Sequence, residues 1–374
     1  MEQKGRLPAL DSMRAIAALG VVCWHYRGYF QSSPFETVLA PFYKNGLPMV
    51  DFFFALSGFV LARTYWTDSR RRAIGANIGQ RIARLYPLHL IMLLVILAIQ
   101  LGTSNLAIPF DPFRFNDAYN FGANLLLLQS SGLQHGLFSF NQPSWSISTE
   151  FLVNIAFLCM IALPRRLSLI TAGAAAVACI QVFLHRSFYD IGYAWWHVSV
   201  LVARTGAGFF IGALTFRLYE NYRDRFTQAA LWNALFIAFA MAMYVYFHSH
   251  RLNGRGIDLA ISLIGFPASI IVVLMSPWAC RALSIRTLVW LGERSYSIYM
   301  IHFSLILCAR IGQIILGVEP SRPFASDSAF VAFVSIVIAI SAVTYRYIEL
   351  PGKRLLTPKR SAQNSSPNLD EATA

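Results

Sequence analysis

Residues 13–30 read MRAIAALGVVCWHYRGYF, an apolar stretch of helix length that carries two widely spaced ionisable side chains, Arg14 and His25. They lie eleven positions apart, about three turns at ~3.6 residues per turn, so both project from nearly the same helix face, roughly 16 Å apart along the axis. An arginine at the centre of a bilayer costs at least ~2.5 kcal/mol, and ionisable residues at such depth usually line a polar cavity. The pair therefore indicates a buried reaction site or an ion path.

The composition is that of an integral membrane protein. Of the 374 residues, 56% are hydrophobic and 13% charged, and the mean hydropathy is +0.51, values that no ordinary soluble domain of this length combines. The apolar runs lack the alternation of a transmembrane barrel, so helices must satisfy the backbone within hydrocarbon. We therefore expect an all-α fold, a polytopic bundle of transmembrane helices.

Breakers and charges divide the apolar runs into ten expected spans, at approximately 13–30, 47–66, 85–102, 145–163, 167–184, 197–216, 229–247, 257–276, 288–309 and 327–348. Lys and Arg number eighteen in the amino-terminal segment, alternate loops and carboxyl tail, and six in the other loops, at Lys44, Arg114, Arg186, Arg251, Arg255 and Arg322. This bias predicts a plasma (inner) membrane protein with both termini cytoplasmic. We expect one transmembrane domain over residues 1–351 and a disordered cytoplasmic tail over 352–374.

The sequence gives no sign of metal or nucleic-acid binding. The five cysteines lie singly inside apolar runs, without a CxxC pair or a cluster of metal ligands. The net charge of +13 falls in short loops between apolar spans, where it reports topology. No metal and no tightly bound cofactor is expected, and the oligomeric state is not readable from these residues.

Three more ionisable residues interrupt other spans. Asp51, in NGLPMVDFFFALSGF (45–59), either caps its helix or pairs with a neighbouring cation. Glu150, in QPSWSISTEFLVN (142–154), is either a helix-start carboxylate or a buried group that must be paired or protonated. His302, in LGERSYSIYMIHF (291–303), lies deeper than an aromatic belt explains. For Arg14 the alternative to a functional role is that of a topology anchor, whose side chain extends to the membrane interface.

Six motifs in this order resemble the membrane acyltransferase-3 family, whose members O-acylate saccharides and other acceptors. They are the Arg14 and His25 pair, VDFFFALSGF (50–59), RIARLYP (81–87), WSISTE (145–150), SYSIY-x-x-H (295–302) and IELP (348–351), within a resemblance that runs from Leu7 to Pro351. The resemblance implies a ten-helix domain that takes an acyl group, usually acetyl, from acyl-coenzyme A on the cytoplasmic side. It also implies delivery of that group to an acceptor at or beyond the outer face.

The resemblance also implies which residues matter. Arg14 and His25 match the family's essential pair, and its further motifs match Arg81, Arg84, Trp145, Ser146, Glu150, Tyr299 and His302. There are two departures. His302 is followed by Phe303 and Ser304, where the family often has a proline two residues after the histidine. The short tail leaves no room for the extracytoplasmic hydrolase-like domain that some relatives append, so the acceptor is left more open than usual.

Acyl transfer from a thioester to a hydroxyl needs a base, groups that stabilise the oxyanion, and anchoring of the coenzyme phosphates. We predict His25 as the general base, because an unperturbed imidazole has a pKa of ~6.5, with Glu150 as a candidate carboxylate to orient it. Direct transfer is favoured over an acyl-histidine intermediate. Guanidinium groups bind phosphate bidentately, so Arg14, Arg81 and Arg84 are predicted to hold the donor, with topology as the competing explanation. The rest of the expected substrate-binding set is Asp51, Trp145, Ser146, Tyr299 and His302.

A transporter or a flippase of lipid-linked sugars is the alternative class, because Asp51, Arg204, Glu293 and Arg294 suit an ion path. Neither alternative predicts the six motifs, and the span lengths show no paired broken helices of the inverted-repeat kind. We therefore expect a membrane O-acyltransferase whose partners are acyl-coenzyme A as co-substrate, a saccharide or cell-surface glycan as acceptor, and membrane lipids.

Overall fold

The computed structural model describes residues 6–66, 73–104, 114–136, 138–183, 186–187, 189–190, 192, 199–251 and 255–357. Helices make up most of these ranges, and none of them contains a β-strand. The all-α prediction is therefore confirmed for the described chain. The expected tail lies outside the described residues from position 358 onward, and the last helix carries the chain to Leu356.

Sixteen α-helices occur in the described chain. They are α1 (Pro8–Phe30), α2 (Glu36–Asn45), α3 (Pro48–Tyr65), α4 (Ile74–Thr103), α5 (Ala118–Leu125), α6 (Trp145–Ile161), α7 (Arg165–Gln181), α8 (Val200–Tyr222), α9 (Ala229–Ser249), α10 (Ile257–Ala260), α11 (Phe266–Met275), α12 (Pro277–Ala282), α13 (Arg286–Glu293), α14 (Ser295–Leu316), α15 (Asp327–Thr344) and α16 (Leu350–Leu356). Single π-helical turns, Ile261–Gly265 and Tyr345–Glu349, join α10 to α11 and α15 to α16.

Seven helical segments are long and apolar enough to cross a membrane, namely 74–103, 142–161, 200–222, 229–249, 257–275, 295–316 and 327–356. The pair α2 and α3 forms an eighth if a bend of 70° is counted within one span. The two remaining expected spans correspond to α1, which carries Asp11, Arg14 and Arg27, and to α7, which has 17 residues. Ten spans and the sides of the termini thus stay predictions.

Two of the expected boundaries differ from the observed helices. The span expected at 85–102 begins at Ile74, so Arg81 and Arg84 extend from the same unbroken helix as the apolar residues that follow. Pro87 lies inside α4 without ending it. The span expected at 288–309 divides at Arg294 into α13 and α14. Both differences concern polar ends of apolar helices, where hydropathy marks the apolar part alone.

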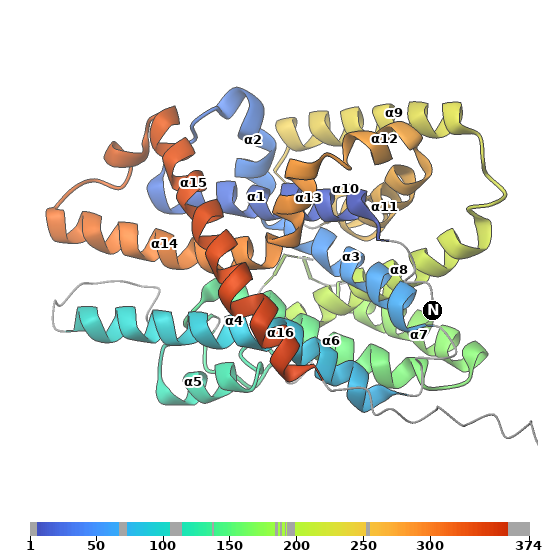
Figure 1. The fold of residues 1–374 in the computed structure, drawn as a ribbon, viewed down its shortest axis with the longest axis horizontal. Helices are drawn as coiled ribbons and strands as arrows, with labels where there is room; N and C mark the ends of the chain where they lie inside the picture. The colour runs from blue at the N-terminus through green and yellow to red at the C-terminus, as the bar shows by residue number, and fades with distance from the viewer. Residues whose placement is uncertain are drawn as a thin grey trace, which may run out of the picture.

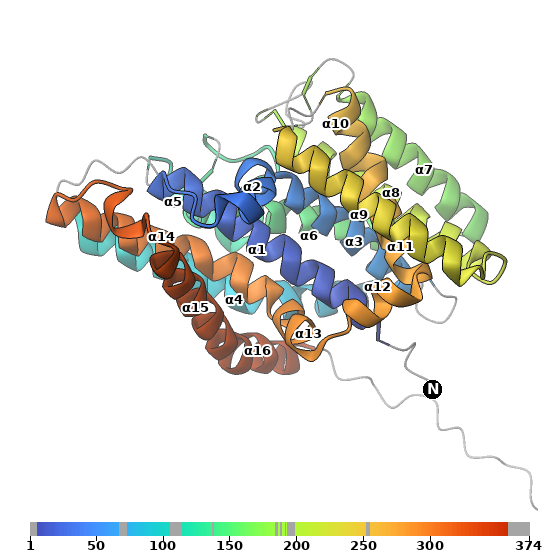
Figure 2. The same ribbon diagram turned by 90° about the horizontal axis from the view of Figure 1, so that it is seen from above.

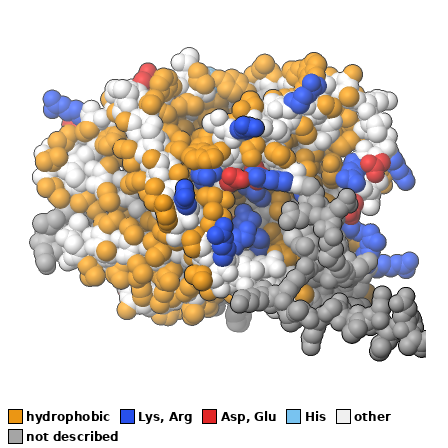
Figure 3. Space-filling view, in the orientation of Figure 1, with side chains coloured by type: hydrophobic (Ala, Val, Ile, Leu, Met, Phe, Trp, Pro, Cys, Tyr) orange, Lys and Arg blue, Asp and Glu red, His pale blue; other side chains and the backbone are white. Residues whose placement is uncertain are grey.

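Helix α1 runs through the middle of the bundle (Figures 1 and 2), where it packs against α3, α13 and α14. Helices α15 and α16 cross the face formed by α14 and α4, and α7 covers α8 at the opposite edge. The surface in Figure 3 is largely apolar, with Lys and Arg side chains gathered near its middle, over α13 and α16. The helix that carries Arg14 and His25 is therefore the central one.

Glycines make a very close contact between α3 and α8. A Cβ atom at Gly58 would lie 1.9 Å from the backbone oxygen of Phe209, and one at Gly212 would lie 1.9 Å from that of Ala55. Gly208 and Gly212 have the four-residue spacing at which small residues let membrane helices approach closely. This contact brings the polar residues of the two helices within reach of one another.

We predict that Gly212→Leu destabilises the protein by about 1–3 kcal/mol or more, because the added side chain must push α3 away from α8. The measurement is the thermal unfolding midpoint of the purified protein in detergent. Gly173→Leu, on α7, is the matched control, because a Cβ atom at Gly173 meets nothing within 4 Å. Equal midpoints for the two variants would contradict the close contact.

Candidate active site

Helices α1, α3, α4, α6 and α14 enclose a pocket that we call the arginine pocket. Its lining includes Arg14 from α1, Arg81 and Arg84 from α4, and Glu150 from α6. Tyr299 of α14 borders it as well. Three guanidinium groups against one carboxylate make this a cationic cavity within an apolar bundle, which is the environment of an anion-binding site.

The cations of the arginine pocket are only partly neutralised by the protein. Arg14 donates to Asp11 at 2.9 Å, and Asp11 also accepts from Arg6. In the described chain no carboxylate lies within 4.0 Å of a guanidinium nitrogen of Arg81 or Arg84. The buried Nε of Arg81 has no hydrogen-bond partner. Leaving a buried charged donor unpaired costs free energy, which an anionic ligand would recover.

Glu150 lies on the same side as the arginines. Its Oε1 accepts a hydrogen bond of 2.6 Å from the Ser57 hydroxyl. The structure does not bring Glu150 to His25, so the expected orienting contact is absent from the described contacts of either residue. The pairing was expected from the chemistry of base catalysis alone, whereas the helix packing sets which partner His25 meets.

A second cavity, which we call the histidine pocket, lies next to the first. Its lining includes Trp24 and His25 from α1, Trp145 from α6 and Arg204 from α8. Val50 and Tyr299 border both pockets. The two cavities therefore meet at these two residues, one cavity on the Arg14 side of α1 and the other on the His25 side.

Tyr299 is fixed in this position by hydrogen bonds. Its hydroxyl donates to the backbone oxygen of Pro143 at 2.8 Å and lies 2.8 Å from the hydroxyl of Ser146. Ser146 is buried and borders the arginine pocket. Ser146 and Pro143 thus hold the hydroxyl of Tyr299, the residue that borders both cavities.

The imidazole of His25 meets a second imidazole. Nε2 of the fully buried His302 lies 3.2 Å from Nδ1 of His25, and the ring centroids are 4.9 Å apart. Nδ1 of His302 faces the backbone oxygen of Ile298 at 3.2 Å. Because a carbonyl oxygen only accepts, Nδ1 of His302 carries the hydrogen and its Nε2 is an acceptor.

The same argument fixes the tautomer of His25. Its Nδ1 lies 3.1 Å from the backbone oxygen of Val21 and faces the acceptor nitrogen of His302. With acceptors on both sides, Nδ1 carries the hydrogen, which leaves Nε2 with a free lone pair. The structure thus holds His25 in the form that a general base requires, and His302 occupies the orienting position that was predicted for Glu150.

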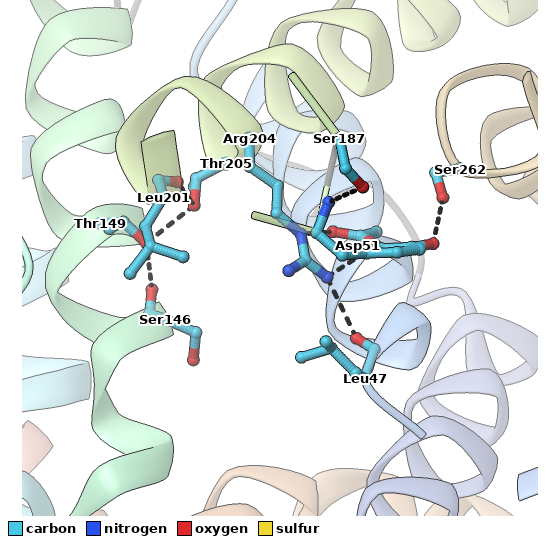
Figure 4. Close-up of polar contacts among 10 residues, drawn as sticks. Leu47, Asp51, Ser146, Thr149, Ser187, Leu201, Arg204, Thr205 and Ser262 are labelled. Atoms are coloured by element: carbon cyan, nitrogen blue, oxygen red, sulfur yellow. Dashed lines mark hydrogen bonds and ion pairs between the residues drawn. The ribbon is translucent and has the colours of Figure 1, made fainter. Parts of the chain in front are cut away.

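Asp51 forms a buried ion pair with Arg204 (Figure 4). Arg204 donates from Nε to Oδ1 of Asp51 at 2.7 Å and from Nη2 to Oδ2 at 3.0 Å. Each side chain is 1% exposed. Nη2 also lies 3.3 Å from the backbone oxygen of Leu47. Arg204 lines the histidine pocket, and Asp51 is its buried ion-pair partner. Of the two alternatives expected for Asp51, the structure shows the pairing with a cation.

Arg204 is a charged residue that lines the histidine pocket and is not among the expected substrate-binding residues. The rings of Trp145 and Tyr189 lie 5.5 Å and 4.6 Å from its guanidinium carbon. An arginine within an apolar helix is the same signal that singled out Arg14. Such an arginine indicates that a polar cavity lies beside it, and for Arg204 that cavity is the histidine pocket.

Comparison with known proteins agrees with the expected resemblance. The family profile described as an acyltransferase domain, that of acyltransferase-3, matches residues 7–346. The chain is 27% identical over 398 aligned residues to Acyltransferase MdmB of Streptomyces mycarofaciens, across 98% of this chain and 97% of that protein.

Other relatives match a smaller part of this chain or match it at lower identity. Protein 2 in picA locus of Rhizobium radiobacter is 31% identical over 163 residues, across 41% of this chain and 81% of that protein. O-acetyltransferase SACOL0978 of Staphylococcus aureus (strain COL) is 22% identical across 93% of this chain and 57% of that protein. No solved structure matches the chain. Because the family match covers nearly the whole sequence, the protein belongs to the acyltransferase-3 family and is an acyltransferase of groups other than aminoacyl groups.

Proposed function

We propose that the protein moves an acyl group, in the first instance acetyl, from acyl-coenzyme A to a hydroxyl of a saccharide or glycan. The observation that carries the proposal is the pair of adjoining cavities that share Val50 and Tyr299. One cavity offers cations and the other offers a base. The names of the relatives, acyltransferase and O-acetyltransferase, agree with this chemistry.

The donor is assigned to the arginine pocket. Coenzyme A carries phosphate groups, and guanidinium groups bind phosphate with parallel hydrogen bonds. Arg81 and Arg84 have no carboxylate partner within ion-pair distance among the described residues, so their charge is available to a ligand. The thioester would then point toward Tyr299 and Val50, where the acyl carbon reaches the other cavity.

The acceptor is assigned to the histidine pocket. Nε2 of His25 takes the proton of the acceptor hydroxyl, and the oxygen of that hydroxyl forms the ester bond to the acyl carbon. The carbon–sulfur bond breaks, and the coenzyme leaves as a thiolate that recovers the proton from the imidazolium. His302 keeps the reactive nitrogen of His25 free of hydrogen at the start of each cycle.

The proposed placement in the membrane follows from the same two cavities. Coenzyme A is available in the cytoplasm, so the arginine pocket opens to the cytoplasm of a plasma (inner) membrane protein. Both termini are then cytoplasmic, and α1 and α7 complete ten spans. A transporter or flippase is the competing function. It predicts substrate movement without the release of free thiol.

We predict that purified protein given acetyl-coenzyme A and an acceptor glycan releases free thiol, and that His25→Ala lowers the rate by about 10²- to 10⁴-fold, the usual contribution of a general base. Thiol titration follows the reaction, and elution volume and unfolding midpoint show that the variant is folded. Thiol release by His25→Ala at the normal rate would refute the base. Transport by a wild-type protein that releases no thiol would favour the rival class.

We predict that Arg81→Lys and Arg84→Lys each raise the donor KM by about 10- to 100-fold, because lysine keeps the charge but loses the paired hydrogen bonds. Initial rates at varied acetyl-coenzyme A give this constant. Arg354→Lys, an exposed position on α16, is the matched control. An unchanged donor KM in both pocket variants would leave topology as the explanation for these arginines.

We predict that His302→Leu lowers kcat about 10- to 100-fold, the size of effect seen when a metal-bound histidine loses the partner that orients it, with little change in either KM. His302→Gln keeps an acceptor oxygen toward His25 and should recover part of the rate. Steady-state kinetics of both variants test the assignment. Equal rates for the two variants would show that packing at this position, not hydrogen bonding, is what matters.

A further inference from the structure

Three cations gather around a depression at the end of α1 that lies beyond His25. The depression, which we call the vestibule, is lined by Trp24, Arg27, Gly28, Tyr43, Lys44, Ser249 and Arg251. Arg27 and Arg251 are exposed and Lys44 is half-buried. These cations come from α1, from α2 and from the segment after α9, so the fold and not one local run of sequence brings them together.

The charge of the vestibule is not neutralised by the protein. No acidic side chain lines it in the part of the chain that the structure describes, and none of its three cations forms an ion pair there. Glu36 lines a separate depression, which shares Arg27 with the vestibule. The vestibule therefore has a net positive charge.

The positive charge of the vestibule is unusual for the side of the protein on which it is expected to lie, the outside of the cell. Only six Lys and Arg residues fall in the loops expected outside the cell, because cations are selected against in loops that are translocated. Lys44 and Arg251 are two of the six, and both line one depression together with Arg27. The positive-inside bias does not explain why Lys44 and Arg251 occur on the side expected outside the cell, or why they lie together there. Another function for these cations is therefore needed.

The vestibule is held in place by buried hydrogen bonds. Asn45, which is fully buried, donates to the backbone oxygens of Phe247 and His250, both at 2.9 Å. Lys44 donates to the backbone oxygen of His248 at 2.6 Å, which uses one of the three donors of its ammonium group. These bonds fasten the end of α2 to the end of α9. Lys44 is therefore positioned before any ligand arrives.

The vestibule adjoins the histidine pocket through a single side chain. Trp24 lines both, and its ring centroid lies 4.6 Å from that of His25. A Cβ atom at Gly46 would lie 2.0 Å from Cβ of Trp24, so the glycine lets the chain pack directly against this residue. A sugar ring that places a hydroxyl at His25 would therefore lie beside Trp24 and project its next substituent toward the cations.

We propose that the vestibule binds an oxyanion, a carboxylate or a phosphate, carried by the saccharide acceptor next to the hydroxyl that is acylated. The inference deepens the proposed function and rests on it for the position of the acceptor. It assigns Arg27, Lys44 and Arg251 as the groups that recognise an anionic acceptor and discriminate against a neutral one of equal size.

The test is calorimetric titration of the full-length protein in detergent at low salt with three matched sugars. These are maltose, the same disaccharide with its terminal sugar oxidised to glucuronate, and maltose 1-phosphate. At least one anionic sugar should bind about tenfold more tightly than maltose, from three charge pairs of ~0.5 kcal/mol each. The preferred anion identifies the acceptor chemistry, and added salt should narrow the difference.

The triple variant Arg27→Gln, Lys44→Gln, Arg251→Gln should bind all three sugars alike. Arg114→Gln, which removes one charge from outside the vestibule and both pockets, should keep the discrimination. Equal affinities in the wild type, no binding of any sugar at millimolar concentration, or discrimination that survives in the triple variant would each overturn the proposal. Loss of discrimination in phosphatidylglycerol nanodiscs would also overturn it, because lipid headgroups would then be the occupants.

The binding result is independent of the chemistry at His25. A wild-type protein that discriminates the anionic sugar, but whose His25→Ala variant releases thiol normally, keeps the vestibule and loses the proposed base. The reverse pattern, with loss of thiol release in His25→Ala and equal sugar affinities in the wild type, keeps the base and loses the vestibule.

Discussion

The cost of placing charge inside an apolar helix bundle governs the arrangement of this site. Each ionisable group must be paired within the protein, kept neutral, or matched by a ligand. Asp51 and Arg204 take the first course, since they satisfy each other with two short hydrogen bonds. His25 and His302 take the second, as two neutral rings in defined tautomers. Arg81 and Arg84 line the arginine pocket without a carboxylate partner among the described residues, which leaves the third course, a ligand, as the one we propose for them.

The ion pair and the helix contact behind it support each other. Glycines at positions 58, 208 and 212 let the backbones of α3 and α8 approach closely, which brings Asp51 opposite Arg204. Breaking a buried pair by removing one partner is costly because the other charge stays buried. The histidine pocket is thus built on a rigid side that consists of two touching helices, and not on a loop.

The parts of the site that sequence predicts are those set by local periodicity. Arg14 and His25 share a face because they lie eleven residues apart on one helix, and the apolar runs locate most helices within a few residues. The contact of His25 with His302 joins residues 277 apart, and that of Asp51 with Arg204 joins residues 153 apart. Such contacts depend on which helix faces pack together, which hydropathy does not specify. For the same reason the sequence does not indicate that Glu150 lies beside Ser57 and that His25 lies beside His302.

The junction between the two cavities is where the proposed donor and acceptor would meet. Val50 and Tyr299 line both the arginine pocket and the histidine pocket, so the two cavities adjoin at these residues. The tie from Tyr299 to Pro143 fixes the ring in that place. In the proposed reaction, a thioester held by the arginines and an alcohol held at His25 would meet at this junction. Excluding bulk water there would protect the thioester from hydrolysis. The proposed enzyme needs only an acyl group to pass between the cavities, whereas an ion path would need a continuous polar route through the same junction.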